Sequence, residues 1–382
     1  MKKNAEVVII GGGVVGTAIA YNLAGIGVKD VVLVERDTLA SGSTGRAAGG
    51  IRQQWSEPAN VRLARASIDI FKNFKKTMGR DIGLVEGGYL LVAYTDEEVE
   101  RFKVNIAMQR DVGADVRLVT PEEVRDIVPF YNTEGILAAA YCPDDCHGDP
   151  FLVTVGYAEN AARLGAEINL RTEVRAIKKK GDRATTVVTS RGDINCNWVV
   201  NAAGGYSAEV GKMAGLDLPT VSYRHQILVT EPVQRILEPL VVDFHHGIYF
   251  CQSVHGAFIS GQGDDDEPPG HDVRGSWRFM VEQAKKLTFL VPALKDISVV
   301  RQWAGLYNMS PDAQPILGRV PGVENFIVAI GFSGHGFMLA PIVGVLMAEL
   351  IVHGEARTLP IDNLSITRFE KGIPSTREAN VV

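Results

Sequence analysis

The chain has 382 residues, more than a typical single domain of about 100–200 residues, which predicts two lobes with separate cores. Its 46% hydrophobic and 22% charged residues are typical of a globular protein. The net charge of −6 argues against binding to nucleic acid or to an anionic membrane surface, since both favour basic proteins.

The first predicted elements are a buried strand at residues 7–10, a glycine turn and a helix. Gly11 permits the tight turn, Gly13 lets the backbone approach a pyrophosphate, and Gly16 lets the helix pack closely on the strand. The phosphates would meet the N-terminus of the helix, where N–H groups and the helix dipole favour negative charge. An ordinary strand–turn–helix is the alternative explanation.

A second predicted strand, residues 31–34, supports the nucleotide interpretation. It ends at Glu35, 19 residues after Gly16, where a carboxylate can accept hydrogen bonds from an adenosine ribose. Loop, strand and acid together agree with a dinucleotide-binding fingerprint.

The start of the chain superficially resembles a secretory signal, because Met1-Lys2-Lys3 precede an apolar run and a small-residue site at 18–20. The glycine cluster interrupts that apolar run, so we expect a cytoplasmic protein. The longest apolar segment, residues 337–352, contains Glu349 and is shorter than the roughly 20 residues that span a bilayer. We therefore expect no transmembrane segment.

Residues 41–55 form a predicted loop rich in glycine and hydroxyl side chains, which suits a second contact with phosphates. A flexible surface loop is the alternative. The position of Arg52, between Ile51 and two glutamines, favours a functional loop because flexibility alone does not require that pattern.

The middle of the chain alternates between helices and strands. Its predicted helices are 60–76, 96–113, a helix capped by Thr120, 149–164 and 277–290, and its predicted strands are 87–93, 166–170, 173–177, 187–189, 194–196 and 198–205, with a charged turn at 178–182. Cys142, Cys146 and His147 could suggest zinc, but they lack a second ligand pair, and we expect no metal site.

Two later strands could approach the same nucleotide. The strand from residue 198 ends in Ala202, Ala203 and Gly204, which would let its backbone reach the cofactor, although a plain buried strand is also compatible. Residues 223–263 show alternating segments that predict an antiparallel sheet with one exposed face, able to cover a cofactor.

The last informative stretch is a strand at 326–330, a glycine turn at 331–336 and a helix to about residue 351. It supplies a second helix N-terminus, whose N–H groups can face negative charge developing in a ring system. His335 lies between two glycines at this helix start. We expect it to face the cofactor, as a positive charge or a hydrogen-bond donor, because it can hardly join a core there.

These motifs, together with two others, resemble the FAD-dependent D-amino acid oxidase and sarcosine oxidase family. The similar segments are 11–16 with Glu35, 41–52, 199–204, 310–318 and 331–337, and the β subunits of multi-subunit sarcosine oxidases and L-proline dehydrogenases also share 50–54 and 224–226. The resemblance implies an α/β fold: a Rossmann-like, glutathione-reductase-type FAD-binding domain and a second α+β substrate domain built on an antiparallel sheet. The FAD-binding domain would comprise 1–82, 146–218 and 308–382, and the substrate-binding domain 83–145 and 219–307.

The same resemblance implies hydride transfer from a carbon bearing an amine to flavin N5, giving an imine that water hydrolyses. The FAD would be noncovalent, because Gly305 stands where monomeric sarcosine oxidases carry the attached cysteine. The histidine that carries a covalent FMN in heterotetrameric sarcosine oxidase is absent near residues 149–150, which leaves a noncovalent FMN at a subunit interface compatible with the sequence. A partner α subunit or another electron-accepting subunit would belong to such an enzyme.

Departures from the family pattern affect the substrate side. Met338 replaces a lysine, and Tyr307 replaces the arginine that binds the substrate carboxylate in glycine and D-amino acid oxidases. Arg52 is then the best remaining carboxylate partner, since guanidinium and carboxylate match in two parallel hydrogen bonds. The predicted catalytic residues are His335, Arg52, His225 and Tyr249. The predicted cofactor-binding residues are Gly11, Gly13, Val14, Val15, Gly16, Glu35, Arg36, Gly42, Ser43, Thr44, Gly49, Gly50, Ile51, Val174, Ala202, Ala203, Gly204, Gly305, Gly331, Gly334, His335, Gly336, Phe337 and Met338.

The leading hypothesis is therefore an FAD-dependent dehydrogenase or oxidase of a small amino acid such as sarcosine, proline or glycine. An FAD-dependent 2-hydroxyacid or glycerol-3-phosphate dehydrogenase is one alternative, although phosphate recognition would want more basic residues than Arg52 supplies. A flavin-carrying subunit whose main role is assembly is another. The fold alone does not decide among them.

Overall fold

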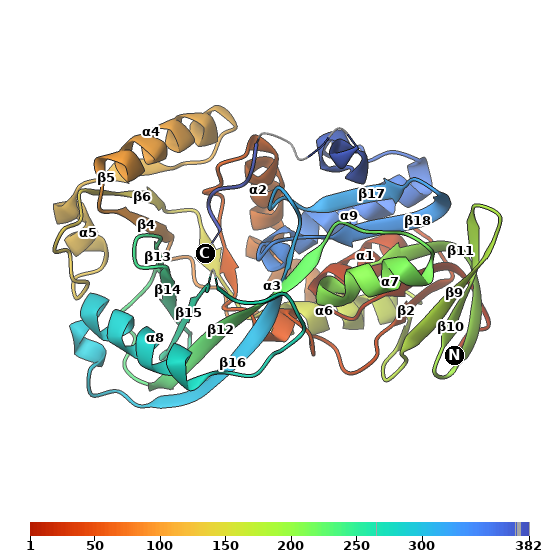
Figure 1. The fold of residues 1–382 in the computed structure, drawn as a ribbon, viewed down its shortest axis with the longest axis horizontal. Helices are drawn as coiled ribbons and strands as arrows, with labels where there is room; N and C mark the ends of the chain where they lie inside the picture. Colours follow the sequence, from red (N-terminus) through yellow and green to blue (C-terminus); the bar gives the residue numbers. More distant parts are fainter. Residues whose placement is uncertain (265, 371, 373–375, 382) are drawn as a thin grey trace.

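Two eight-stranded sheets, side by side in Figure 1, form the framework of the chain. The computed structural model describes residues 1–264, 266–370, 372 and 376–381. The first sheet carries the N-terminal strand, and the second lies at the opposite end of the molecule.

The first sheet has the order β17-β18-β11-β1-β2-β8, with β9 and β10 as a hairpin that continues from β11. Its core strands run parallel, and β17 is antiparallel to β18. The strands are β1 (Asn4–Ile10), β2 (Val31–Val34), β8 (Glu167–Asn169), β9 (Val174–Lys180), β10 (Arg183–Thr189), β11 (Gly192–Asn201), β17 (Ile316–Val320) and β18 (Val323–Ile330).

Both faces of this sheet are covered, which explains the unbroken apolar strands in the sequence. Along β1, Val7 and Ile9 belong to one core, whereas Val8 and Ile10 belong to the other. The first face carries α1 (Val14–Gly25), α2 (Pro58–Lys72), α6 (Pro150–Arg163) and α9 (Gly336–His353), and α7 (Ser207–Met213) packs on the other.

Helix α9 is apolar all round because it is buried in the first core. Among the described residues it is the one helix long and apolar enough to cross a membrane by length and composition, and 72% of that segment is buried in the fold. A buried core helix satisfies the same criteria.

The second sheet has the order β16-β12-β15-β14-β13-β4-β6-β5. Its pairs are antiparallel except β13 with β4. The pairs within 223–263 are thus antiparallel, as the sequence predicted, and the one parallel pair joins that region to β4. No hairpin joins β4 to β13, so no turn fixes their direction. The strands are β4 (Tyr89–Ala93), β5 (Arg117–Val119), β6 (Ala138–Cys142), β12 (Val221–Pro232), β13 (Leu240–Asp243), β14 (Ile248–Gln252), β15 (Ala257–Gln262) and β16 (Val299–Met309).

Helices α4 and α5 begin at the residues that the sequence indicated. Thr95 and Thr120 each accept a hydrogen bond from the backbone N–H three residues later, and the glutamate there bonds back to the capping backbone. The remaining helices and short strands are α3 (Phe74–Met78), α4 (Asp96–Asp111), α5 (Pro121–Ile127), α8 (Trp277–Leu290), β3 (Gly50–Ile51), β7 (Cys146–His147), and the 3₁₀ turns η1 (Thr44–Arg46), η2 (Gly204–Tyr206), η3 (Pro292–Leu294), η4 (Asp362–Leu364) and η5 (Ile366–Phe369).

Three local predictions differ from the structure. The predicted helix 60–76 is divided at Asn73, whose side chain donates to the carbonyl of Asp69 and ends α2. The turn predicted at 178–182 is shorter in the structure, because β9 extends to Lys180 and the chain reverses at Gly181, which has φ +60°. The segment from residue 192 to residue 201 is one continuous strand, β11, because it pairs with both β10 and β1.

Candidate functional site

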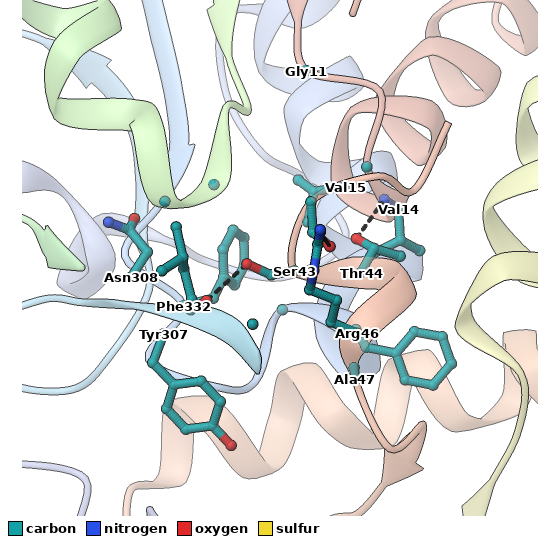
Figure 2. A pocket seen from close by; sticks show the side chains of 18 of the residues that line it. Gly11, Val14, Val15, Ser43, Thr44, Arg46, Ala47, Tyr307, Asn308 and Phe332 are labelled. Atoms are coloured by element: carbon teal, nitrogen blue, oxygen red, sulfur yellow. Dashed lines mark hydrogen bonds between the residues drawn. The ribbon is translucent and has the colours of Figure 1, made fainter. Parts of the chain in front are cut away.

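A cavity of about 560 Å³ lies where the carboxyl ends of the first sheet meet the second sheet. The register places Ile10 beside Val34 and Asn201, so β1, β2 and β11 end at one edge. This edge is where parallel α/β sheets bind ligands. Figure 2 shows the part of the cavity between the glycine turn, the loop around Ser43 and Thr44, and the end of β16.

The glycine turn after β1 is shaped for close backbone contacts. Gly11 has φ +120°, and a Cβ there would lie 2.3 Å from the carbonyl oxygen of Ala202. A Cβ on Gly16 would lie 2.0 Å from the carbonyl oxygen of Gly11. Only glycine fits both positions, and the first turn of α1 is thereby directed at the cavity.

Glu35 lies at the end of β2 beside this turn. Its carboxylate accepts hydrogen bonds from the backbone N–H of Gly12 at 2.7 Å and of Asp37 at 2.9 Å. Next to it, the Arg36 guanidinium lies 3.7 Å from the ring centre of Tyr206, which also stacks on His271 at 4.3 Å. Tyr206 lines the cavity and was not predicted, although it lies two residues after Gly204, one of the predicted cofactor residues.

The loop from residue 41 to residue 50 is held by both lobes, in contrast to a flexible surface loop. Thr44 Oγ1 accepts a hydrogen bond from the N–H of Val14 at 3.2 Å, as Figure 2 shows. Ser43 Oγ donates to the carbonyl of Leu306 at 2.7 Å, and the Trp303 indole donates to the carbonyl of Arg46 at 3.0 Å. The loop therefore connects the start of α1 to β16.

The second glycine turn, before α9, is fixed by β16. Gly331, Ser333 and Gly334 have φ values of +66°, +49° and +93°, so three residues within four are left-handed. Asn308 accepts hydrogen bonds from the backbone N–H of Gly331 at 2.8 Å and of Ser333 at 3.0 Å. The turn is thus held in place before any ligand binds.

His335 caps α9 and lines the cavity, but its environment differs from the prediction. Its side chain is only 1% exposed and stacks on Trp55, with ring centres 3.9 Å apart, so it does join a core. Burial lowers its pKa to about 4, which favours the predicted hydrogen-bond donor over the predicted positive charge. Neither ring nitrogen has a hydrogen-bond partner among the described residues, and a neutral donor remains available.

Arg52 lines the same cavity as Glu35. It is 6% exposed, and its guanidinium lies 3.9 Å from the ring centre of Trp55. Its Nη2 donates to the carbonyl oxygen of Asn380, whereas Nη1 has no partner within the described part of the chain. Burial lowers the pKa of Arg52, and the nearby Tyr89 and Glu378 oppose that shift.

His225 and Tyr249 line the cavity from the second sheet. His225 Nε2 lies 3.1 Å from the hydroxyl of Tyr249, and the imidazole stacks on Tyr307 with ring centres 4.1 Å apart. Burial lowers the pKa of His225 to about 3 and raises the pKa of Tyr249 well above 10. Both side chains are neutral across the physiological pH range.

The cavity lining includes all four predicted catalytic residues. Three predicted cofactor residues lie outside it: Gly16 packs on Gly11, Ile51 pairs with Cys146 in the core, and Gly331 packs against Ser310. The predicted cofactor residues that do line it are Gly11, Gly13, Val14, Val15, Glu35, Arg36, Gly42, Ser43, Thr44, Gly49, Gly50, Val174, Ala202, Ala203, Gly204, Gly305, Gly334, His335, Gly336, Phe337 and Met338.

The sequence missed several lining residues, among them Trp55, Tyr89 and Val381. Trp55 is the last residue of the predicted loop 41–55. Its position three residues after Arg52 was the one available signal. Cys142 and Cys146 are buried free thiols, and the described residues contain no group of three or more histidines, cysteines or acids that could hold a metal.

Comparisons with known proteins agree with this geometry. Residues 6–350 match the family model described as FAD dependent oxidoreductase (DAO). The sarcosine oxidase β subunit of Rhodobacter capsulatus is 29% identical, over 97% of this chain and 90% of that protein. The mitochondrial dimethylglycine dehydrogenase of Rattus norvegicus is 32% identical over 93% of this chain, which spans only 44% of that longer relative. The crystal structure of L-proline dehydrogenase from P. horikoshii has a TM-score of 0.93 and 38% identity, and covers 97% of this chain and 99% of its own.

Proposed function

This chain belongs to the DAO family of FAD-dependent oxidoreductases, and from that premise we propose that it oxidises the C–N bond of a small amino acid of the sarcosine, proline or glycine type. The observation that carries the proposal is a buried guanidinium, Arg52, which has one nitrogen without a partner among the described residues and lines the same cavity as the nucleotide fingerprint. Such a group matches the carboxylate that all these substrates share.

The cavity fits FAD in extended form. Glu35 and Arg36 mark the adenosine end, the first turn of α1 offers N–H groups for the pyrophosphate, and the turn at 331–336 faces the ring end. No cysteine is among the described residues that line the cavity, which supports noncovalent binding. When bound, FAD would supply the acceptor for the hydride that leaves the carbon beside the amine.

Three buried side chains that line the cavity with Arg52 have pKa shifts that favour their neutral forms. Neutral His225, Tyr249 and His335 surround the space, and burial disfavours additional charge there. A substrate ammonium is therefore destabilised relative to the neutral amine, which is the form that can release a hydride. The residues position the amine and exclude water, and no strong general base is required.

We propose further that the chain works as a subunit of a heteromeric enzyme. The support is its coverage of 90% of a sarcosine oxidase β subunit, whose name implies partner subunits. The FMN that the sequence left open is not part of the proposal, because the matching family is described by FAD alone.

The test is anaerobic bleaching of the purified yellow protein by a panel of compounds. Sarcosine, proline, glycine and dimethylglycine form one group, and lactate and glycerol 3-phosphate form the other. We expect bleaching by at least one member of the first group and by none of the second. Bleaching by a hydroxy acid or by glycerol 3-phosphate alone would overturn the proposal, and a stable yellow colour with every compound would favour an assembly role.

A further inference from the structure

The segment at residues 376–381 returns from the surface of the first lobe to the centre of the molecule. In Figure 1 the C-terminal end lies between the two sheets, near the start of α2. Within it, Glu378 and Asn380 are each 2% exposed, while Arg377 and Ala379 are exposed. Alternate residues thus point into the protein, where they meet the candidate substrate site.

Glu378 anchors this segment at the N-terminus of α2. Its carboxylate accepts hydrogen bonds from the backbone N–H of Ser56 at 2.8 Å and of Glu57 at 3.2 Å. It also accepts from the Ser56 hydroxyl at 2.7 Å and from the Asn60 side-chain amide at 2.9 Å. Glu57, the N-cap residue of α2, makes no side-chain capping bond among the described residues, and Glu378 places a carboxylate beside the N-terminus of this helix, where the helix dipole favours negative charge.

Asn380 connects this anchor to Arg52. Its side-chain amide donates to the carbonyl of Gln54 at 3.0 Å, and its own carbonyl accepts a hydrogen bond from Arg52 Nη2. The guanidinium therefore has one edge held by the segment and one nitrogen, Nη1, without a partner among the described residues. The next residue, Val381, lines the cavity beside it.

We propose that residues 378–381 form one wall of the substrate site. In this arrangement Glu378 and Asn380 are positioning residues that orient Arg52, and Val381 limits the size of the substrate. The inference rests on the proposed role of Arg52 in binding a carboxylate. The wall would also make the site selective for small amino acids, because a bulky substituent beside the carboxylate would meet the Val381 side chain.

The size limit is tested on the FAD-loaded protein with two carboxylate probes, acetate and benzoate, by isothermal titration calorimetry. In Val381→Ala the ratio of benzoate affinity to acetate affinity should be roughly tenfold higher than in the parent, because the substitution removes part of the wall. An unchanged ratio of the two affinities would overturn the proposed role of Val381. The probes require no turnover, so the result does not depend on knowing the substrate.

The orienting role is tested with Glu378→Ala, which removes the anchor. We expect roughly tenfold weaker binding of acetate and an increased KM with little change in kcat, because Arg52 loses its orientation while the reacting groups are untouched. Arg377→Ala, at the exposed neighbouring position, is the matched control and should bind acetate as the parent does. Asn380→Ala is a second variant, in case Glu378→Ala fails to fold. It removes the side-chain bond to Gln54 that holds the backbone carbonyl of residue 380 against Arg52, and it should also weaken acetate binding.

The two levels of inference fail separately. If Arg52→Met binds acetate as tightly as the parent, the carboxylate site itself is wrong. If Arg52→Met loses acetate binding, the carboxylate site stands. If Asn380→Ala then keeps the parent affinity for acetate and Val381→Ala keeps the parent benzoate-to-acetate ratio, the proposed wall is wrong.

Discussion

The two ends of the cavity are built in different ways. At the nucleotide end, the glycine turn and Glu35 come from one continuous stretch, β1 through β2, in which Glu35 accepts from the N–H of Gly12, and more distant segments pack around this unit. At the substrate end, side chains from five separate parts of the chain meet, namely Arg52 with Trp55, Tyr89, His225 with Tyr249, Tyr307 and the segment ending in Val381. The first end is a local motif, whereas the second exists only in the folded chain.

Gly13→Val should have the largest effect, and it should affect the nucleotide end of the cavity alone. Gly13 has φ −80°, so its backbone tolerates a side chain, and the nearest atom to an added Cβ is Thr44 Oγ1 at 3.0 Å. The branched side chain should occupy the place of the pyrophosphate and abolish FAD binding while the chain still folds. The ratio of flavin to protein after purification measures this. Gly25→Ala, on the same helix with its nearest neighbour 4.0 Å from the added Cβ, should keep its FAD.

Arg52→Met should damage only the substrate end. A hydrogen bond to a charged group contributes about 1.5–3 kcal/mol, so KM for the amino acid should rise roughly 10- to 100-fold with the flavin content unchanged. Steady-state kinetics on the FAD-loaded protein check it, with Arg62→Met on the exposed face of α2 as control. An equal loss for an amine without a carboxylate would show that Arg52 supports the loop, not the substrate.

The contrast between the two ends also explains what the sequence could predict. The strand–glycine–helix unit and the starts of the helices at Asp96 and Pro121 depend on neighbours within a few residues, and they were predicted. Arg52 was identified by type and position, but its stacking on Trp55 was not. Glu378 contacts Ser56, 322 residues away, and no periodicity or spacing encodes such a pairing.

The pairing of β13 with β4 escaped prediction for the same reason. Alternation within a strand indicates which side chains face the core, but the order and direction of strands from separate segments depend on packing. The environment of His335 is a third case, because Trp55, which buries it, lies 280 residues earlier in the chain.

Glu35→Gln should have a smaller effect, and only at the nucleotide end. The substituted amide keeps one acceptor oxygen for the N–H of Gly12 but loses the charge, so FAD should bind several-fold to tenfold more weakly without loss of the fold. Titration of the FAD-free protein with FAD, followed by fluorescence quenching, measures the change. If the variant retains FAD as tightly as the parent, the carboxylate serves only the turn.

The effect expected at His335 is absent at neutral pH and arises only in acid. Burial lowers its pKa from 6.5 to about 4, so the unfolded chain binds a proton at this residue between those values and the folded chain does not. Stability is therefore lost as the pH falls from 6.5 towards 4, and at pH 5 the loss is roughly 2 kcal/mol. His335→Phe keeps an aromatic ring on Trp55 but cannot be protonated. Its melting temperature should fall less between pH 7 and pH 5 than that of the parent, by a few degrees, whereas the exposed control His255→Phe should follow the parent. Parallel curves for all three proteins would mean that the pKa of His335 is not lowered in the folded state.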